Sequence, residues 1–508
     1  MYDTASKLGV PELSSRLSGR VTAPPARLLH EEILAPQFAY DVANLLPFYL
    51  AIEKVLLCEY VRLGLVSSTD ASTIATVLDG VDVASLTASP DTNMSDFAFA
   101  LERHVEERLP HPVPAWHVDR SRNDLQSCAQ LMFGRDQLGL VADELLALGR
   151  AAHELACATA DLPMPGFTHL QAAQVISPGF YLAAIVEQAL HTSGRLLATY
   201  DGIDSCPLGS GALSGQELVW DRDRMAALLG FTRPQPHALV AVASREWALE
   251  ITAELSVLGV GLSRFVTDMM AWGSSQYGFL ELPDSHAGIS AAMPQKKNFP
   301  LLERIRGRSA HLSTYHLDVV LGQRGTPFSN MVEVHKEALA NLLTALTTAR
   351  STLRLFTEVL THVKFRPDRM LAACEREHLG GFTLANRLTL HEGVPWRRAQ
   401  VIAGQYVVAA AGSGRPPQDV DPTLLADVAQ RHGVELAAPA AILKDAFDVA
   451  AGLREKQSAG STNPDSVRTL LATQADQLTG TAVAWELRRG RVTDALAAVD
   501  HQLTGAAG

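Results

Sequence analysis

The sequence has 508 residues, 47% of them hydrophobic, and a formal net charge of −12 at pH 7. This length and composition allow a large buried core and exclude disorder over most of the chain. The negative charge disfavours nonspecific binding to nucleic acid or to an anionic membrane, because both require a positive surface potential. It does not exclude a small anionic substrate, since such a ligand responds to the cations of a cleft and distant charges are screened beyond about 8 Å.

The five cysteines are widely spaced and form no Cys-x-x-Cys pair. An odd number of isolated cysteines favours reduced thiols and argues against a structural zinc site. The chain does not open with a basic segment followed by an apolar one, and proline, glycine or charged residues interrupt its most apolar stretches. We therefore expect a cytoplasmic protein that has no membrane span, binds no nucleic acid and needs neither a cofactor nor a metal ion.

The first part of the chain predicts an irregular arm followed by helices. Residues 1 to about 35 show no sustained periodicity, which is typical of an arm that wraps a neighbouring chain. From Phe38 to Leu65 apolar residues recur near helical spacing, and Pro47 marks a candidate first helical turn. Asp70 and Asp91 are candidate N-caps of two later helices.

Long helical patterns fill the middle of the chain. One extends from Leu125 to Ala160, another reaches Tyr200, and a third runs from Ser244 to Trp272. Residues 299–362 continue as two helical segments that are divided near Gly325-Thr326-Pro327. Helices of this length with so little polar surface are typical of a bundle that several chains share.

These patterns predict a mainly α-helical protein with three domains. We assign residues 1–112 to an N-terminal helical domain with its irregular arm and residues 113–364 to a central helical bundle. A boundary near Phe365-Arg366-Pro367 would begin a C-terminal helical domain, residues 365–508.

Candidate anion-binding side chains gather in residues 117–124, which read His-Val-Asp-Arg-Ser-Arg-Asn-Asp. Guanidinium groups offer forked donors that fit a carboxylate, as recognition of a dicarboxylate requires. The alternative is a purely structural cluster of ion pairs. Upstream, Asp96 and Glu102 occupy one helical stretch, and on their own they are typical of a solvated helix face.

A candidate proton-transfer residue, His169, lies in residues 164–174, which read Met-Pro-Gly-Phe-Thr-His-Leu-Gln-Ala-Ala-Gln. The Pro-Gly pair breaks the preceding helix before another helical run begins. A lone histidine in a helical protein is more often structural than catalytic. A catalytic role for His169 is therefore supported only by the motif around it.

The densest group of reactive side chains lies in residues 288–298, which read Gly-Ile-Ser-Ala-Ala-Met-Pro-Gln-Lys-Lys-Asn. Gly288 and the small residues around Ser290 predict a mobile loop. The helical spacing that follows places Lys296 and Asn298 near a helix start, where anions bind readily. The plain alternative is a solvated pair of lysines at the beginning of a helix.

Together these motifs resemble those of the fumarase/aspartase superfamily, and most closely its argininosuccinate lyase branch. A glycine-rich stretch at residues 207–215 matches as well, and the resemblance runs from about residue 35 to 490. It implies an all-α, three-domain fold with a long central bundle shared between subunits. It also implies a homotetramer whose active sites each combine three chains, and a cofactor-free elimination that releases fumarate.

The resemblance assigns roles to individual residues. Ser290 would be the base that takes a proton from carbon, and His169, oriented by Glu303, would supply or relay a proton near the leaving nitrogen. The remaining matched positions would contact the substrate: Asp96, Ser121, Arg122, Asn123, Thr168, Gln171, Lys296, Asn298, Phe328, Glu333 and Lys336.

Several positions depart from the family pattern near the chemical centre. Ile289 and Ala291 flank the serine where the family has Gly-Ser-Ser, which bears on the flexibility of the loop. Ala98 stands where the family has a histidine. Asp119 replaces a glycine and would add a negative charge to an anion site.

Other departures fall where argininosuccinate lyases hold the arginine-like end of their substrate. Gln37 replaces a serine, Phe328 a tyrosine and Glu333 a glutamine. The sequence therefore predicts a carbon–nitrogen lyase that cleaves an N-substituted aspartate to fumarate, as in arginine biosynthesis. One alternative is a specialised lyase for another N-succinyl compound, and a second is a non-catalytic, crystallin-like homologue, against which the presence of Ser290 and His169 argues.

Overall fold

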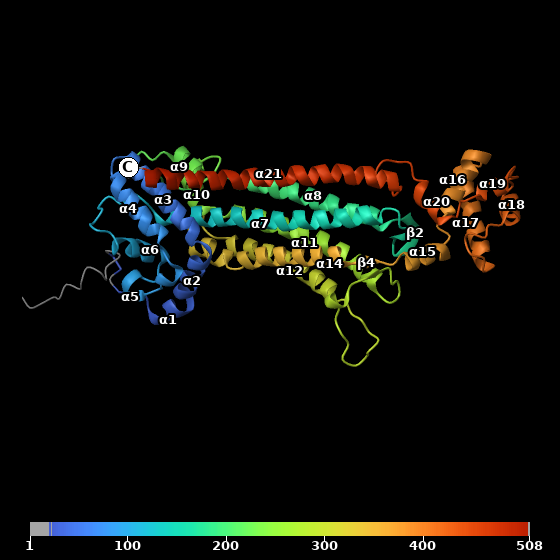
Figure 1. Ribbon diagram of the computed structural model, residues 1–508, viewed down its shortest axis with the longest axis horizontal. Coiled ribbons are helices and arrows are strands. Elements are labelled where there is room, and N and C mark those ends of the chain that lie inside the picture. Colours follow the sequence, from blue (N-terminus) through green and yellow to red (C-terminus); the bar gives the residue numbers. More distant parts are fainter. Residues whose placement is uncertain (1–19, 22, 506–508) are drawn as a thin grey trace, which may run out of the picture.

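A bundle of long helices runs along the longest axis of the molecule, with shorter helices at both ends (Figure 1). The structure, a computed structural model, describes residues 20–21 and 23–505. The bundle helices are α7 (Arg122–Thr159), α8 (Pro178–Ile203), α11 (Glu246–Gly273), α12 (Pro300–Gln323), α14 (Leu342–His362) and α21 (Pro464–Gly505). The prediction of a mainly α-helical protein built on long helices is confirmed.

Local sequence signals set where these helices begin. Ser121 caps α7 by accepting a hydrogen bond from the backbone N–H of Asn123, and Ser177 caps α8 in the same way. Proline occupies the first turn of α8 and of α12, where its missing N–H costs no helical hydrogen bond. The break before residue 300 therefore places Asn298 and Lys296 just outside α12, close to the expected helix start.

One end of the molecule is made of short N-terminal helices: α1 (Arg27–Leu29), a π-helical turn (His30–Leu34), α2 (Ala35–Asn44), α3 (Leu46–Arg62), α4 (Ser68–Asp79), a 3-10 turn (Val83–Ser85), α5 (Pro90–Asn93) and α6 (Phe97–Glu106). Pro47 lies in the first turn of α3, as expected. The predicted irregular arm is wrong for residues 27–35, which are helical, and its residues 1–19 and 22 lie outside the described ones.

The predicted N-caps of two of these helices are also wrong. Ser67 caps α4 by accepting from the backbone N–H of Asp70 at 3.0 Å, and Ser89 caps α5. Asp70 and Asp91 lie in the first turns instead, where a carboxylate still favours the positive end of the helix dipole.

Short elements join the bundle helices. The helical ones are α9 (Arg222–Leu228), α10 (Ala238–Ala243), α13 (Val332–His335) and two 3-10 turns (Asp284–His286 and Glu337–Leu339). The strands form two antiparallel pairs: β1 (Met164–Thr168) with β2 (Gln171–Ile176), and β3 (Leu280–Glu281) with β4 (Lys364–Phe365). The sequence did not predict the β1–β2 hairpin, which replaces the loop expected between the helices on either side of it.

The opposite end carries a second hydrophobic core, formed by α16 (Gly381–Glu392), α17 (Trp396–Gly412), α18 (Pro422–Arg431) and α19 (Pro439–Leu443). Helices α15 (Pro367–Arg376) and α20 (Val449–Arg454) lie between this core and the bundle. Residues 464–505, predicted to belong to the C-terminal domain, instead pack along the bundle as α21. The indole of Trp485 is fully buried there and donates to Ser193 on α8.

The bundle combines close internal packing with exposed apolar side chains. A Cβ at Gly259 on α11 would lie 2.5 Å from the carbonyl oxygen of Ser309 on α12, so these helices approach too closely for a larger residue. More than half of each of four aliphatic side chains on the same two helices is exposed: Val257, Val260, Leu317 and Leu321. Among the described residues, no helix is both long and apolar enough to span a membrane.

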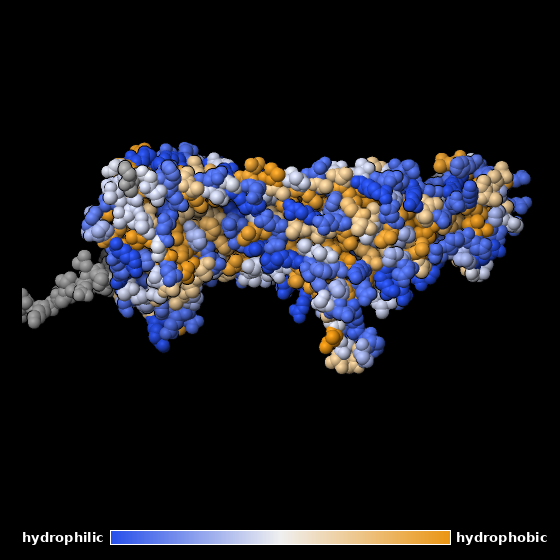
Figure 2. All heavy atoms as spheres, viewed as in Figure 1, coloured by the Kyte–Doolittle hydropathy of each residue, from blue (hydrophilic) through white to orange (hydrophobic). Residues whose placement is uncertain are grey.

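A loop between β3 and α12 projects from the side of the bundle and carries hydrophobic surface (Figures 1 and 2). Ile289, in this loop, is 92% exposed. The loop corresponds to the segment in which the sequence predicted the base serine.

Candidate active site

The start of α7 holds three of the predicted substrate-binding residues, next to a fourth from α6. Arg122 pairs with Asp96, the N-cap of α6, and its guanidinium lies 5.1 Å above the ring of Phe99. Asn123 donates from its side-chain amide to the carbonyl oxygen of Ala212 at 2.9 Å. Together with Ser121 these side chains surround the positive end of a long helix, which suits a carboxylate ligand.

The residues just before α7 form a structural ion-pair network. Glu53, only 3% exposed, accepts from His117 at 3.1 Å and pairs with Arg120. Glu102 lies 3.2 Å from the same arginine. Burial alone would raise the pKa of Glu53, but Arg120 and His117 outweigh it and lower that pKa to about 2. The alternative of a structural cluster thus holds for the first half of this motif, and Glu102 does not lie on a merely solvated face.

The carboxylate of Asp119, which the sequence predicted to add negative charge to the anion site, is engaged in hydrogen bonds with a neighbouring segment of the chain. It accepts from the backbone N–H groups of Glu217 and Leu218, at 3.1 and 2.8 Å, and from the indole of Trp220. These hydrogen bonds outweigh partial burial and lower the pKa of Asp119. The substitution of glycine by aspartate therefore ties a neighbouring segment to the start of α7.

The glycine-rich stretch at residues 207–215 is held against α7 by a buried carboxylate. Asp124 accepts from the backbone N–H groups of Gly209 and Gly211, both at 3.0 Å. Both glycines have positive φ, which other residues rarely adopt. Burial raises the pKa of Asp124 to about 7 in spite of these hydrogen bonds. This stretch brings its backbone, including the carbonyl oxygen of Ala212, to the site.

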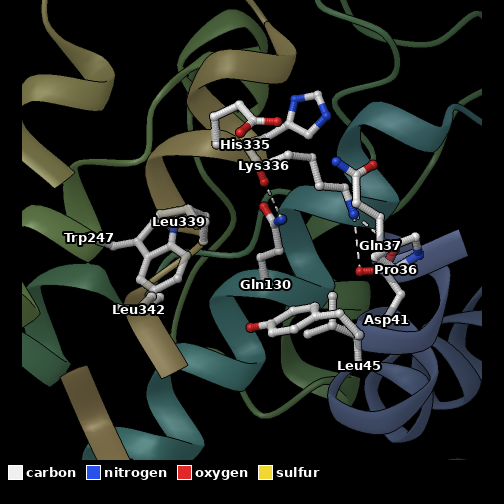
Figure 3. Close-up of a pocket in the computed structure, with 13 residues that line it drawn as sticks. Pro36, Gln37, Asp41, Leu45, Gln130, Trp247, His335, Lys336, Leu339 and Leu342 are labelled. Atoms are coloured by element: carbon white, nitrogen blue, oxygen red, sulfur yellow. Dashed lines mark hydrogen bonds and ion pairs between the residues drawn. The ribbon is translucent and has the colours of Figure 1, made fainter. Parts of the chain in front are cut away.

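A cavity of about 230 Å³ opens beside the α7 site, between α2, α7 and the residues around α13 (Figure 3). Lys336 crosses part of it and contacts both carboxylate oxygens of Asp41, at 2.8 and 3.0 Å. Burial nevertheless raises the pKa of Asp41, and Asp96 adds to that shift. Gln37 also lines the cavity and makes no side-chain hydrogen bond to the described residues.

Two residues predicted to contact the leaving group lie outside this cavity. The ring of Phe328 is 58% exposed, and Glu333 is exposed at the start of α13. Neither lines the cavity, whereas their neighbour His335 does. Burial, with Arg245 and Lys336 nearby, lowers the pKa of His335 to about 3, so its imidazole is neutral.

Arg245 supports the cavity from behind, a role that sequence reasoning missed. It is 1% exposed and donates to the side chains of Gln130 and Ser127 at 3.0 and 2.9 Å. Gln130 in turn donates to the carbonyl oxygen of His335 at 2.7 Å. No local sequence pattern marks these contacts, whereas the cavity carboxylate Asp41 lies only four positions after Gln37, which the sequence had already placed at the leaving-group end of the site.

His169 lies at the tip of the β1–β2 hairpin. Thr168 pairs with Gln171, so the turn consists of His169 and Leu170, and both have positive φ, 54° and 61°. Such two-residue turns usually carry asparagine and glycine, because other residues are strained there. All four residues are exposed, and Leu170 is 79% exposed. The hairpin therefore presents His169, the predicted proton-transfer residue, and its neighbours outward, at a cost in backbone strain.

Ser290 lies in the projecting loop, which a small bridge closes at its base. Gly288 and Asn298 exchange two backbone hydrogen bonds of 2.8 and 3.0 Å. The hydroxyl of Ser290 accepts from the backbone N–H of Met293 at 3.1 Å. Lys296 is exposed, whereas Lys297 pairs with Asp284 at 2.8 Å. The loop thus has a fixed base and a tip that makes few contacts within its own chain.

The predicted partners do not all meet within one chain. Lys296, Asn298 and Glu303 line a common cavity of about 660 Å³, but neither Ser290 nor His169 lines it. Glu303 is exposed and forms neither a hydrogen bond nor an ion pair with His169 among the described residues. The expected imidazole–carboxylate pair is therefore not formed within this chain.

Within one chain, Arg122 and the hairpin that carries His169 lie at opposite ends of α7. Arg122 begins this 38-residue helix, and the hairpin follows its other end (Figure 1). At about 1.5 Å per residue the helix is roughly 55 Å long. A ligand the size of a dicarboxylate cannot touch both ends, so the α7 site and the hairpin of one chain cannot serve the same substrate molecule.

Comparisons with known proteins show the family to which this chain is related. A profile described as Lyase matches residues 61–312. Argininosuccinate lyase of Moorella thermoacetica is 30% identical over 70% of this chain and 77% of its own length, and that of Desulforudis audaxviator is 32% identical over 71% and 78%. The chain belongs to the fumarase/aspartase superfamily. It is accordingly a lyase, and the resemblance inferred from its motifs is confirmed.

Solved structures of the superfamily share the fold. A variant of EDDS lyase with bound fumarate matches with a TM-score of 0.83 and 24% identity, over 98% of both chains. A class II fumarase from Schistosoma mansoni matches with a TM-score of 0.65 and 17% identity, over 82% of this chain and 94% of the fumarase. Both similarities concern the fold, and the individual site residues stay predictions.

Proposed function

We propose that this superfamily member is a carbon–nitrogen lyase that releases fumarate from an N-substituted aspartate of the argininosuccinate type. The observation that carries the proposal is the projecting loop, which holds a half-buried Ser290, an exposed Lys296 and a half-buried Asn298 and is anchored at its base by the bridge between Gly288 and Asn298. A base on such a loop can close over a substrate held elsewhere. This arrangement suits an elimination in which a proton must be removed from an otherwise unreactive carbon.

The chemistry requires stabilisation of a doubly charged carboxylate. Ser290 takes the proton from the carbon next to a carboxylate, and the amine then leaves from the adjacent carbon. Oriented donors lower the barrier by surrounding the charge that develops. Lys296, Asn298 and Thr168 supply such donors, and Arg122 with Asn123 holds the substrate at the positive end of α7.

His169 completes the set as the group that supplies or relays a proton near the leaving nitrogen. Glu303 orients it only if it comes from another chain, since one chain does not join the two residues. A carboxylate behind an imidazole selects its tautomer and keeps it basic enough to exchange protons near neutrality. The elimination itself needs no cofactor.

The assembly we propose is a homotetramer in which each active site combines three chains. The length of α7 supports it, because the α7 site and the hairpin must come from different chains. The exposed aliphatic side chains on α11 and α12 support it as well, since such surface is typical of an interface. Arg122, His169 and Ser290 would then meet only after assembly.

The cavity beside the α7 site supports a leaving amine other than arginine. Lys336 is neutralised by Asp41, while Gln37 presents an amide without a protein partner among the described residues. A leaving group with both donors and acceptors suits this amide. We propose an N-succinyl compound other than argininosuccinate as the preferred substrate. If argininosuccinate is turned over well instead, arginine biosynthesis in the cytoplasm becomes the assignment.

Release of fumarate from a panel of N-succinyl compounds, followed by ultraviolet absorbance, tests the proposal. We expect turnover of at least one member, and loss of that turnover in Ser290→Ala. A folded, oligomeric protein that releases fumarate from none of them would contradict the lyase proposal. Activity on argininosuccinate alone would contradict the specialised substrate but not the chemistry.

A further inference from the structure

Three potential metal ligands meet at the base of the projecting loop. His286 comes from the 3-10 turn just before the loop, and Glu358 and His362 come from the last turn of α14. One donor atom of each residue lies within 4.8 Å of the other two. The carboxylate of Glu358 is 2.8 Å from Nε2 of His286 and 3.3 Å from Nδ1 of His362.

The backbone arranges these groups without strain. Glu358 and His362 are four residues apart on one helix, so their side chains lie on the same face. The two imidazoles stack with ring centres 4.7 Å apart and planes at 27°, which turns a nitrogen of each toward the carboxylate. Sequence spacing could not reveal this cluster, because His286 is separated from its partners by more than 70 residues.

We propose that His286, Glu358 and His362 form a binding site for a first-row transition-metal dication of the zinc type, which fixes the base of the loop that carries Ser290. Two imidazoles and one carboxylate are a ligand set that zinc accepts, with water in the fourth position. For bonds of about 2.0–2.2 Å, tetrahedral ligands lie roughly 3.3 Å apart. The distance of 3.3 Å already has this spacing, whereas the hydrogen bond of 2.8 Å is shorter. Nδ1 of His362 also lies 3.0 Å from the backbone carbonyl oxygen of Glu358, so both imidazoles must rotate to bind a metal.

Exposure and the neighbouring hydroxyl fit the same site. The side chain of His286 is 13% exposed, whereas those of Glu358 and His362 are 50% and 42% exposed, which leaves water access to a fourth position. Ser285 lies 2.8 Å from Nδ1 of His286. With metal on Nε2, this Nδ1–H donates to the Ser285 hydroxyl and holds the ring, as outer ligands of metal sites do.

The position of the site determines its effect on the loop. Only Ala287 separates His286 from Gly288, where the bridge to Asn298 closes the loop. At the other end of the loop, Lys297 is already paired with Asp284. A metal that joins His286 to α14 would therefore fix the segment that enters the loop, as the pair of Lys297 and Asp284 fixes the segment that leaves it. Metal binding is independent of the proposed function, whereas any effect on turnover rests on it.

Zinc stoichiometry tests the site directly. The full-length oligomer is treated with a chelator, freed of it, and dialysed against Zn²⁺, and bound metal is measured by elemental analysis. We expect about one zinc ion per chain, and a loss of affinity of at least about 100-fold in Glu358→Gln and in His362→Gln. Ser285→Ala is expected to cost about 10–100-fold. His391→Gln, at an exposed histidine on α16, is the matched control and keeps full binding.

Hydrogen exchange of the amides of residues 288–298 tests the effect on the loop. Zn²⁺ should slow this exchange in the unaltered protein and in His391→Gln but not in His362→Gln. The proposal would be overturned if the protein bound no stoichiometric zinc, or if Glu358→Gln and His362→Gln bound zinc as tightly as the unaltered protein. Zinc-dependent protection in a protein without lyase activity would uphold the metal site and contradict the proposed function instead.

Discussion

The α7 site and the projecting loop differ in how many hydrogen bonds and ion pairs their side chains make within their own chain. At the α7 site Arg122 is paired, Asn123 is hydrogen-bonded, and a buried network of Glu53, His117 and Arg120 lies behind them. In the loop Ile289 is almost fully exposed, and the hydroxyl of Ser290 has a single contact. The side chains of the α7 site are held in place by partners in their own chain, whereas the loop that carries Ser290 has few contacts within its chain.

This difference indicates a division of labour between chains. A rigid site holds the substrate through fixed donors, while a loop and a hairpin from other chains bring the groups that move protons. The strain at His169 and Leu170 fits the second role, because residues are seldom held at positive φ without a functional constraint. Substitutions in the buried network behind the α7 site should therefore lower stability, whereas substitutions in the loop and the hairpin should lower turnover.

The largest effect is expected from Glu53→Gln. Removing one partner of a buried ion pair costs about 3–5 kcal/mol, so the free energy of unfolding at pH 7 should fall by that amount. The folded pKa of Glu53, about 2, lies below its ordinary value of 4.5, so its contribution is present above pH 4.5 and is lost as pH falls toward 2. Urea unfolding from pH 7 to pH 3 should show this acid sensitivity in the unaltered protein and a flatter profile in the variant.

The exposed pair of Arg103 and Glu107 provides the control for that experiment. Its side chains are 37% and 53% exposed, so Glu107→Gln should change stability by no more than about 1 kcal/mol. An equal loss in both variants would mean that the buried network is no more important to folding than a surface ion pair.

In the loop, Ser290→Ala should lower kcat by at least about 10²-fold and leave unfolding unchanged. A positioned proton-transfer group contributes on this scale, while the hydroxyl supports only one backbone contact. Ser275→Ala is the control and should retain its activity, because this exposed serine lies outside the projecting loop, in the cavity that Lys296 and Asn298 line. Near-normal turnover by a folded Ser290→Ala protein would remove the serine from the role of base.

Mixing two inactive variants tests whether the regions come from different chains. Arg122→Ala and His169→Ala should each be inactive, and subunit exchange should restore up to roughly a quarter of normal activity, because some mixed sites receive both intact groups. A chain that carries both Arg122→Ala and His169→Ala provides the control. Its mixture with Arg122→Ala cannot form an intact site, because no chain keeps Arg122, and should stay inactive. No recovery after proven exchange would contradict sites that are shared between chains.

How far the sequence could predict this structure depends on whether a feature is local. Helix starts at Ser121 and Pro300 follow from neighbouring residues, and the superfamily follows from contiguous motifs. The role of Asp119 could not be predicted, because its partners at residues 217–220 lie nearly 100 positions away. The same holds for Arg245 behind the cavity and for the return of α21 along the bundle.

The last comparison concerns the cavity, where the chain departs from argininosuccinate lyases. Gln37→Ser, Phe328→Tyr and Glu333→Gln combined should raise kcat/KM for argininosuccinate at least about fivefold. A regained hydrogen bond to a buried donor contributes on the order of 1 kcal/mol. Steady-state fumarate release by the triple variant and by Gln37→Ser alone measures this gain.

Comparing the triple variant with Gln37→Ser alone shows how much each position contributes to the gain in kcat/KM. Gln37 lines the cavity and should carry most of the gain, whereas Phe328 and Glu333 are exposed in the single chain and should contribute only if another chain covers them. A gain confined to the triple variant would mean that the leaving group reaches beyond the cavity. If the unaltered protein already cleaves argininosuccinate with kcat/KM of about 10⁴ M⁻¹s⁻¹ or more, the departures do not change its substrate, because such values are ordinary for an enzyme on its natural substrate.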